Sequence, residues 1–324
     1  MKAAFVAVVG RPSAGKSTLV NQICGEKVSI VSEVPQTTRN AIRGILNREQ
    51  GQLVFVDTPG RHHSDKKFNK KLMEVSQRAL NESDIILYLL DTTRPAGVEE
   101  TDLATLLAPL AGRTFAALNK TDLPSADCRR ARDFLARHLP AVEAERCFEI
   151  SAKNKDGIEA LLSALFDMAS DGDPFYDSEC YTDQEVDFRI AEIIREQAIS
   201  RLRQELPHAL YVQVADTEFR NPTALVGMEA ALGDASTGFF AEQKIQPTKS
   251  ARRPVLWVRA FIIVERESQK GMVVGKNGDC IKAIRQASQK ELAKIFDWKI
   301  ELDLRVKTGK DWRHNDHTLR KLIR

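Results

Sequence analysis

The residues that could do chemistry begin near the amino terminus, in the segment Gly10–Ser17 (GRPSAGKS). This segment has the spacing G-x-x-x-x-G-K-[ST]. Glycines at these positions let backbone N–H groups turn inward around phosphate oxygens, and the start of the following helix adds positive potential. Lys16 would reach the β- and γ-phosphates, and the hydroxyl of Ser17 would bind Mg²⁺. Alone, the motif predicts a phosphate site without a base preference.

A second segment, Asp57–Gly60 (DTPG), ends an apolar run where another metal-side carboxylate belongs. Asp57 would hold Mg²⁺ through water, and the N–H of Gly60 would sense the γ-phosphate. We expect Lys16, Asp57 and Gly60 to serve hydrolysis, with Ser17 and Asp57 on the metal side.

Two later segments bear on the base. The carboxylate of Asp122, in Asn119–Asp122 (NKTD), can accept both the N1–H and the exocyclic NH₂ of guanine, a donor pair that adenine lacks. Lys120 can lay its aliphatic stem against the purine face. Ser151–Lys153 (SAK) can present a backbone N–H to the guanine O6. Each segment is weak alone, and NKTD could be a helix cap.

All four segments, in this order and at the ends of predicted strands, predict a GTP site. The residues expected to contact the nucleotide are Gly10, Arg11, Pro12, Ser13, Ala14, Gly15, Lys16, Ser17, Thr18, Asp57, Thr58, Pro59, Gly60, Asn119, Lys120, Thr121, Asp122, Ser151, Ala152 and Lys153.

The elements that must position these residues follow from the hydrophobic pattern. Up to about residue 170, short apolar runs alternate with longer amphipathic stretches, which predicts an α/β fold with a mostly parallel, doubly wound sheet. In such a sheet the carboxyl ends of the strands share one edge, where ligands bind. The predicted strands are 4–9, 41–47, 53–56, 85–90, 114–118 and 147–150, and the predicted helices are 18–24, 68–80, 100–110, 126–138 and 157–168.

The second half of the chain predicts a smaller domain after a linker at 171–183, where Gly, Pro, Asp and Ser accumulate. We expect helices at 185–206 and 278–296 and strands at 209–214, 255–264 and 299–307. Residues 216–254 are poorly patterned and predict an insertion or an extended hairpin.

Composition narrows the class of protein. The 324 residues include 48 Lys+Arg and 45 Asp+Glu, but the charge is unevenly distributed: residues 251–324 carry a net charge of +9, and residues 1–250 carry −6. A basic C-terminal region of this kind is typical of a domain that binds a polyanion, or of a solvated charged face. Five separated cysteines without a C-x-x-C pair argue against a disulfide framework or a zinc site. No apolar run reaches ~18 residues, and Met1–Gly10 reads as a buried strand rather than a signal peptide. We expect a cytoplasmic protein.

The basic end contains the segment Gly275–Gly278 (GKNG) between two predicted helices. A G-x-x-G turn is the feature with which KH domains clamp RNA backbone, although a helix that simply starts at glycine would explain it as well. The order of elements, helix, strand, strand, helix, G-x-x-G, helix and strand, is similar to a type II KH domain. The residues expected to bind RNA are Lys270, Gly275, Lys276, Asn277, Gly278, Lys282 and Arg285.

Taken together, these segments resemble the motifs of translation-factor-related GTPases. Pro35–Arg39 (PQTTR) resembles the switch segment of the Era family of ribosome-assembly GTPases, and Val264–Gly278 and Lys310–Arg313 (KDWR) resemble its KH signature. Related assembly GTPases share only the Thr-Arg pair, so we assign metal sensing, and with it a part in hydrolysis, to Thr38 rather than Thr37. The resemblance implies a GTPase domain at 1–170, a linker at 171–183 and a type II KH domain at 184–324 with an unusual insertion at about 216–254.

The resemblance also implies a partner and a role. It implies GTP-controlled binding of 16S rRNA near its 3′ end, in 16S rRNA processing and assembly of the 30S subunit. Era-family members are also described as peripheral proteins at the inner face of the plasma membrane, but this sequence supplies no amphipathic anchor for such a role. We expect a monomer. Two alternatives stay open: an RNA-binding assembly chaperone in which the nucleotide is structural, and a membrane-associated cell-cycle regulatory GTPase. The GTP-controlled switch predicts that the affinity for RNA differs between the GTP-analogue and GDP states, whereas the chaperone alternative does not.

Arg61 departs from the resemblance. Many small GTPases have Gln directly after the glycine of the DTPG-type segment, where it orients the attacking water. Era-like GTPases replace it with a hydrophobic residue, and this chain has Arg61. Arg61 could neutralise charge in the transition state, or it could be a solvent-exposed side chain on a mobile switch.

Overall fold

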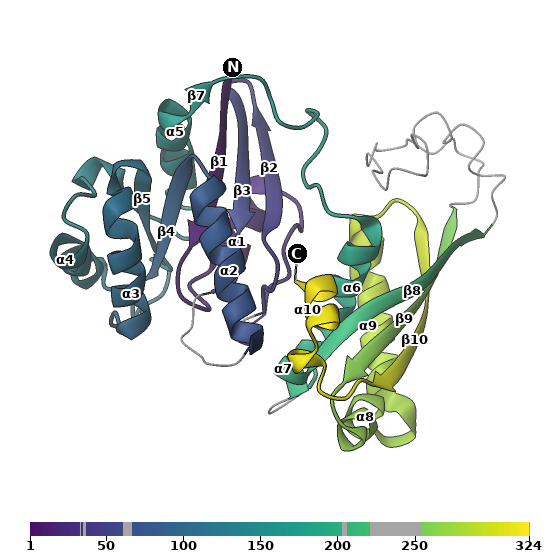
Figure 1. Cartoon of the computed structure of the whole chain (residues 1–324). Helices are drawn as coiled ribbons and strands as arrows, with labels where there is room; N and C mark the ends of the chain where they lie inside the picture. Colours follow the sequence, from purple (N-terminus) through teal and green to yellow (C-terminus); the bar gives the residue numbers. More distant parts are fainter. Residues whose placement is uncertain (33, 35–36, 61–66, 203–205, 221–253, 324) are drawn as a thin grey trace. The chain divides into compact units, whose positions relative to one another are not determined.

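The computed structural model describes residues 1–324 except 33, 35–36, 61–66, 203–205, 221–253 and 324. The chain divides into two compact units, each with its own β-sheet (Figure 1). The first unit holds 1–31, 35–182 and 316–324, and the second holds 32–34 and 183–315.

A mostly parallel sheet forms the centre of the first unit, as the sequence predicts. Its strands lie in the order β2-β3-β1-β4-β5-β6, and among the described strands only β2 and the two-residue β7 pair antiparallel to their neighbours. The bounds are β1 Lys2–Val9, β2 Ile42–Arg48, β3 Gly51–Asp57, β4 Ile85–Asp91, β5 Thr114–Asn119, β6 Cys147–Glu149 and β7 Ser170–Asp171. Because β3, β1, β4, β5 and β6 run the same way, the segments that follow them meet at one edge.

In the described part of the chain, five helices between residues 16 and 168 accompany this sheet. They are α1 Lys16–Cys24, α2 Lys67–Glu82, α3 Val98–Leu107, α4 Cys128–His138 and α5 Ile158–Met168, with 3₁₀ turns at Ala108–Arg113 and Ala144–Arg146. The predicted helix 100–110 is wrong at its end, since α3 stops at Leu107. Pro109 follows, and proline lacks the N–H that would continue the α-helical hydrogen bonds.

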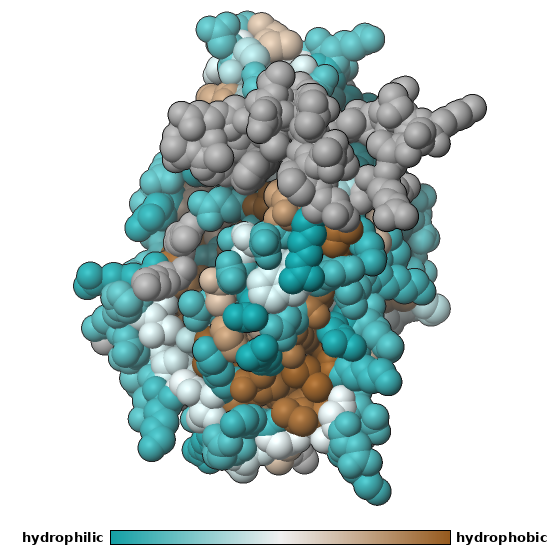
Figure 2. All heavy atoms as spheres, turned by 90° about the vertical axis from the view of Figure 1, so that its right-hand side faces the viewer, coloured by the Kyte–Doolittle hydropathy of each residue, from teal (hydrophilic) through white to brown (hydrophobic). Residues whose placement is uncertain are grey.

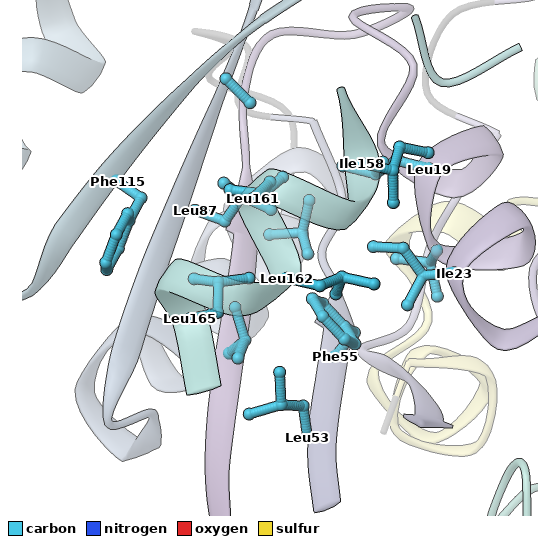
Figure 3. Close-up of a cluster of buried hydrophobic side chains, with 14 of the residues drawn as sticks. Leu19, Ile23, Leu53, Phe55, Leu87, Phe115, Ile158, Leu161, Leu162 and Leu165 are labelled. Carbon is cyan, nitrogen blue, oxygen red and sulfur yellow. The ribbon is translucent and has the colours of Figure 1, made fainter. Parts of the chain in front are cut away.

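Alternate residues of β1 enter two separate hydrophobic clusters, so both faces of the sheet are covered. Val6 and Val8 lie in one cluster and Ala7 and Val9 in the other. Figure 3 shows the first cluster, in which α1 and α5 pack on the sheet through Leu19, Ile23, Leu53, Phe55, Leu87, Ile158, Leu161, Leu162 and Leu165. The second cluster brings in α2, α3 and α4 through Leu80, Leu103, Leu107, Phe134 and Leu135.

Residues 171–182, which make up most of the predicted linker 171–183, are hydrogen-bonded to the edge strand β2 and to its neighbour β3. The backbone oxygen of Tyr181 accepts from Ile45 N at 2.9 Å, and that of Cys180 accepts from Asn47 Nδ2 at 3.1 Å. The buried side chain of Gln52 accepts from the backbone N–H of Tyr176 at 3.0 Å and donates to its oxygen at 2.8 Å. This stretch therefore forms a strap on the first unit.

The second unit has a three-stranded sheet in the order β10-β9-β8. Its elements are α6 Val186–Ile199, α7 Leu206–Ala209, β8 Leu210–Arg220, β9 Val255–Val264, α8 Glu267–Val274, a 3₁₀ turn at Lys276–Gly278, α9 Asp279–Ile295, β10 Lys299–Thr308 and a 3₁₀ turn at Trp312–His314. The last helix, α10 Asp316–Leu322, belongs to the first unit. Strand β9 is antiparallel to β8 and parallel to β10, while α6 and α9 contact each other and the sheet. The predicted order of elements is confirmed.

Two predicted boundaries in this unit are wrong. The helix expected at 185–206 ends at Ile199, although its apolar stripe through Leu202 is buried. The strand expected at 209–214 continues to Arg220, past a register shift between Val214 and Asp216, because β9 supplies pairing partners along its whole length. The expected insertion at 216–254 thus begins as a strand, and residues 221–253 lie outside the described part.

In the described part of the chain, no helix is long and apolar enough to span a lipid bilayer. Figure 2 shows the side that lies to the right in Figure 1, where hydrophilic side chains border a hydrophobic area. Met272 of α8 exposes 56% of its surface.

Candidate functional site

The loop between β1 and α1 is closed by Lys16. Its Nζ donates to the backbone oxygens of Gly10 at 2.9 Å and Arg11 at 3.0 Å, which holds the ammonium inside the loop. Gly15 has a φ of 101°, and a Cβ there would collide with Asn119 Nδ2, so only glycine fits. The loop therefore has the curved backbone that a phosphate group requires.

Burial lowers the pKa of Lys16 to about 8, and the charges of Asp57 and Glu99 act in the opposite direction. A bound phosphate would favour the ammonium form, because an opposite charge stabilises the protonated amine. The protonation of Lys16 is therefore coupled to whatever anion the loop binds.

Asp57, the last residue of β3, is fully buried, and neither carboxylate oxygen has a hydrogen-bond partner. Burial raises the pKa of Asp57, and the charge of Lys16 and the nearby hydroxyls of Ser17, Ser29 and Thr38, which act in the opposite direction, do not outweigh it. A buried carboxylate without hydrogen bonds is costly unless a cation or water satisfies it. The oxygen-rich surroundings are those that Mg²⁺ prefers.

The predicted metal residue Thr38 lies beside this carboxylate. Thr38 Oγ1 and Ser17 Oγ are 3.1 Å apart, so residues from the switch segment and from α1 meet at one point. Thr58, next to Asp57, instead donates its hydroxyl to Val8 O at 2.8 Å and so anchors its loop to β1.

Gly60 lies directly against the phosphate loop. A Cβ on Gly60 would come within 2.9 Å of Pro12 Cα and N, so any side chain would push the two loops apart. Pro59 O accepts from the buried hydroxyl of Ser76 in α2 at 2.9 Å. Arg61 lies outside the described residues.

The base-side loops are joined by Asn119, at the end of β5. Its Nδ2 donates to Ala14 O at 2.8 Å and its Oδ1 accepts from Ala152 N at 2.9 Å, so one amide links three of the predicted segments. Asp122 Oδ1 accepts from Ser151 Oγ at 2.7 Å. The structure thus brings GRPSAGKS, DTPG, NKTD and SAK together at one edge of the sheet.

Sequence reasoning missed two acidic residues at this edge, Asp91 and Glu100. Asp91 ends β4, and its Oδ2 accepts from Lys120 Nζ at 2.8 Å and lies 3.1 Å from Arg11 Nη2. Glu100 pairs with Arg11 at 2.9 Å. The sequence feature that could have indicated Asp91 is its position, because it follows an apolar run, as Asp57 does.

In the second unit, the GKNG turn connects α8 and α9. Gly275 has a φ of 75°, and a Cβ there would lie 2.7 Å from Cys280 Cβ. Asn277 also has a positive φ, of 54°, while Gly278 has open space around it. The turn therefore brings α8 and α9 together with backbone at its surface.

The predicted RNA-binding cations differ in their surroundings. Lys276, Lys282 and Arg285 are exposed, whereas Lys270 is half-buried and pairs with Glu267 at 2.9 Å. The exposed cations of the turn and of the first turns of α9 are of the kind that bind phosphate groups, and the exposed carboxylate of Asp279 lies between them in the sequence.

Comparison with known proteins identifies the family. Residues 5–120 match the family model described as 50S ribosome-binding GTPase, and residues 244–313 match the KH domain model. The chain is 46% identical over 322 residues to the GTPase Era of Treponema denticola, covering 99% of both chains. It is 39% identical over 323 residues to the GTPase Era of Borreliella burgdorferi, covering both completely.

The chain belongs to the Era family of GTPases. A variant of Aquifex aeolicus Era solved with GDP·AlF₄⁻ superposes with a TM-score of 0.84 at 27% identity. An Era solved with MgGDPNP and nucleotides 1506–1542 of 16S ribosomal RNA gives 0.83 at 27% identity, and in both cases 99% of this chain and 98% of the other are covered. Family membership thus rests on the G domain and the KH domain together.

Proposed function

We propose that this Era-family GTPase binds GTP and GDP with Mg²⁺ at the edge of the first sheet. Lys16 and the backbone of Gly10–Thr18 would hold the phosphates, and Asn119–Asp122 with Ser151–Lys153 would hold guanine. The buried, unsatisfied carboxylate of Asp57 carries this assignment, because a hydrated cation would satisfy it.

Ser17, Thr38 and, through water, Asp57 are the proposed metal-side residues. The ion would neutralise charge on the phosphates when bound. The backbone N–H of Gly60 would donate a hydrogen bond to the γ-phosphate and so distinguish GTP from GDP. We expect slow turnover without an added partner, on the order of 10⁻⁴ to 10⁻² s⁻¹.

We further propose that the GTP state controls binding of 16S rRNA near its 3′ end, during 16S rRNA processing and assembly of the 30S subunit. The Era complex with nucleotides 1506–1542 of 16S rRNA supports this partner. The +9 charge of residues 251–324 supports a polyanion ligand. The proposed domains are a G domain at 1–170 and a KH domain at 184–324.

The proposal is tested by RNA affinity in two nucleotide states. Full-length protein is titrated with an RNA spanning nucleotides 1506–1542 of 16S rRNA, once with MgGDPNP and once with MgGDP. We expect tighter binding with MgGDPNP. Equal affinity in both states would contradict the switch and favour the alternative, a chaperone in which the nucleotide is structural.

A matched pair of lysine variants tests the RNA surface. Lys276 in the turn and Lys290 in α9 are both exposed. Lys276→Ala should weaken RNA binding across sequences and reduce its salt dependence, whereas Lys290→Ala should change both less. A membrane-associated regulator without an RNA partner would be indicated if neither variant changed RNA affinity. Cytoplasmic location, peripheral membrane association and the monomeric state remain predictions.

A further inference from the structure

We propose that Asp91 is a positioning residue that fixes the guanine-binding loop relative to the phosphate loop. The inference rests on the proposed nucleotide site and adds to it a residue outside all four sequence motifs. Asp91 would act through Arg11 and Lys120 and would not touch the nucleotide itself.

The carboxylate of Asp91 is inaccessible to solvent and has partners at both oxygens. Oδ2 accepts from Lys120 Nζ at 2.8 Å and lies 3.1 Å from Arg11 Nη2. Oδ1 accepts from the backbone N–H of Thr93 at 3.0 Å and from its hydroxyl at 2.5 Å. One side chain therefore joins the end of β4 to the loops that follow β1 and β5.

On the phosphate side, the connection continues through Arg11, the second residue of the GRPSAGKS loop. Its guanidinium is nine-tenths buried, and Nη1 pairs with Glu100 Oε1 at 2.9 Å. Glu100 Oε2 in turn accepts from Gly97 N at 2.8 Å at the start of α3. Arg11 is thus held by two carboxylates from different elements, which restricts how far the loop can shift.

On the base side, Lys120 is held at both ends. Its backbone has a φ of 71°, which is uncommon for a residue other than glycine, and its ammonium is fixed by Asp91. Thr92, next to Asp91, also donates its hydroxyl to Asn119 O at 2.8 Å. With the ammonium fixed, the aliphatic stem of Lys120 is preorganised to lie along a purine face.

The charges explain why the acid matters. Asp91 and Glu100 balance Arg11 and Lys120, and burying unpaired charge is costly. Burial alone would raise the pKa of Asp91, but hydrogen bonds from Lys120 and Thr93 outweigh it and lower the pKa to about 2. The carboxylate therefore stays ionised throughout the physiological pH range.

The test compares Asp91→Asn with Asp171→Asn in the full-length protein. Asp171 is an exposed aspartate whose Oδ2 lies 3.7 Å from Lys2 Nζ. Asp171→Asn changes the charge and size of the side chain in the same way as Asp91→Asn. The Kd of a fluorescent GDP is measured with Mg²⁺, together with single-turnover hydrolysis of saturating GTP. We expect Asp91→Asn to raise the Kd at least about tenfold, more than it lowers the hydrolysis rate, and Asp171→Asn to leave the Kd within about twofold.

A double-mutant cycle separates positioning from general destabilisation. In a Lys120→Met background, Asp91→Asn should raise the Kd by less than about threefold, because the connection is already broken. Equal fold-changes in both backgrounds, or an unchanged Kd in Asp91→Asn, would overturn the inference. If Asp91→Asn does not fold, Asp91→Glu, which keeps the charge but displaces the carboxylate, is used in the same cycle.

The failure of this inference differs from a failure of the proposed function. Wild-type protein that bound ADP as tightly as GDP would refute the guanine site and the inference with it. Wild-type protein selective for GDP, together with an equally selective and equally tight Asp91→Asn variant, would refute the inference alone.

Discussion

The hydroxyl oxygens of Ser17 and Thr38 lie 3.1 Å apart beside the buried carboxylate of Asp57. Three segments that are distant in sequence therefore place oxygen atoms around one point. This arrangement distinguishes the two neighbouring threonines of the switch segment, because Thr38 contributes its hydroxyl there. It leads directly to the first prediction.

Thr38→Val should weaken Mg²⁺-dependent binding of GDPNP about tenfold or more and should affect GDP less. The variant keeps the shape of the side chain but removes the oxygen proposed to bind the metal, and a tenfold loss corresponds to about 1.4 kcal/mol. Titration of GDPNP binding with Mg²⁺ measures the effect. Thr37→Val is the matched control, and a larger loss in Thr37→Val than in Thr38→Val would contradict the assignment.

The affinity for GDP should fall as the pH rises above about 8. The pKa of Lys16 is lowered by burial to about 8, and a bound phosphate favours the protonated amine. Below that pH the ammonium is present in the free protein, and above it binding must take up a proton, so the Kd should rise by up to tenfold per pH unit.

Binding curves at several pH values between 6 and 9.5 measure this dependence. Lys16→Met should bind weakly and lack the step near pH 8. A step of the same size in Lys16→Met would assign the titration to another group.

Gly275→Ala should destabilise the second unit more than Gly278→Ala does. Both glycines have positive φ, but only at Gly275 would a Cβ meet backbone and side-chain atoms of Cys280, at 2.9 and 2.7 Å. A positive φ alone costs about 1–2 kcal/mol, and the contact adds to it. Chemical denaturation and RNA titration measure the two consequences.

Gly271→Ala is the matched control, since Gly271 lies inside α8 with nothing near its Cβ position. This change should stabilise the unit by about 0.5–1 kcal/mol. Equal losses at positions 275 and 278 would argue against the contact with Cys280.

Gln52→Ala should release the strap formed by residues 171–182. The Gln52 side chain makes hydrogen bonds with Phe175, Tyr176 and Asn47, and the buried groups left behind would lower the free energy of unfolding by about 2 kcal/mol or more. Amide hydrogen exchange at Phe175 and Tyr176 should accelerate. Gln50→Ala, at an exposed position two residues earlier, is the control; equal exchange in both variants would contradict this role.

The site was largely predictable because each motif is local. A glycine-rich loop, a carboxylate after an apolar run and NKTD each carry their chemistry within a few residues, and the parallel sheet collects strand ends at one edge. The structure accordingly brings Lys16, Asp57 and Asn119 together.

What was missed depends on pairs that are distant in sequence. Gln52 and Tyr176 are 124 residues apart, and Asp91 and Lys120 are 29 apart, so no local spacing indicated either contact. The length of β8 was likewise missed because pairing with β9, rather than its own alternation, extends it to Arg220. The local hydrophobic pattern predicts which helices and strands form, whereas contacts with segments distant in sequence decide where they end.

The strap on β2 has a consequence for dissecting the protein. Unpaired edge strands invite association with other chains, and β2 is an edge of the sheet. A fragment cut at residue 170 would leave the N–H of Ile45 and the side-chain oxygen of Gln52 without their partners and would be prone to aggregate. A fragment that retains Thr182, which donates its hydroxyl to Arg43 O at 2.8 Å, would keep that border covered.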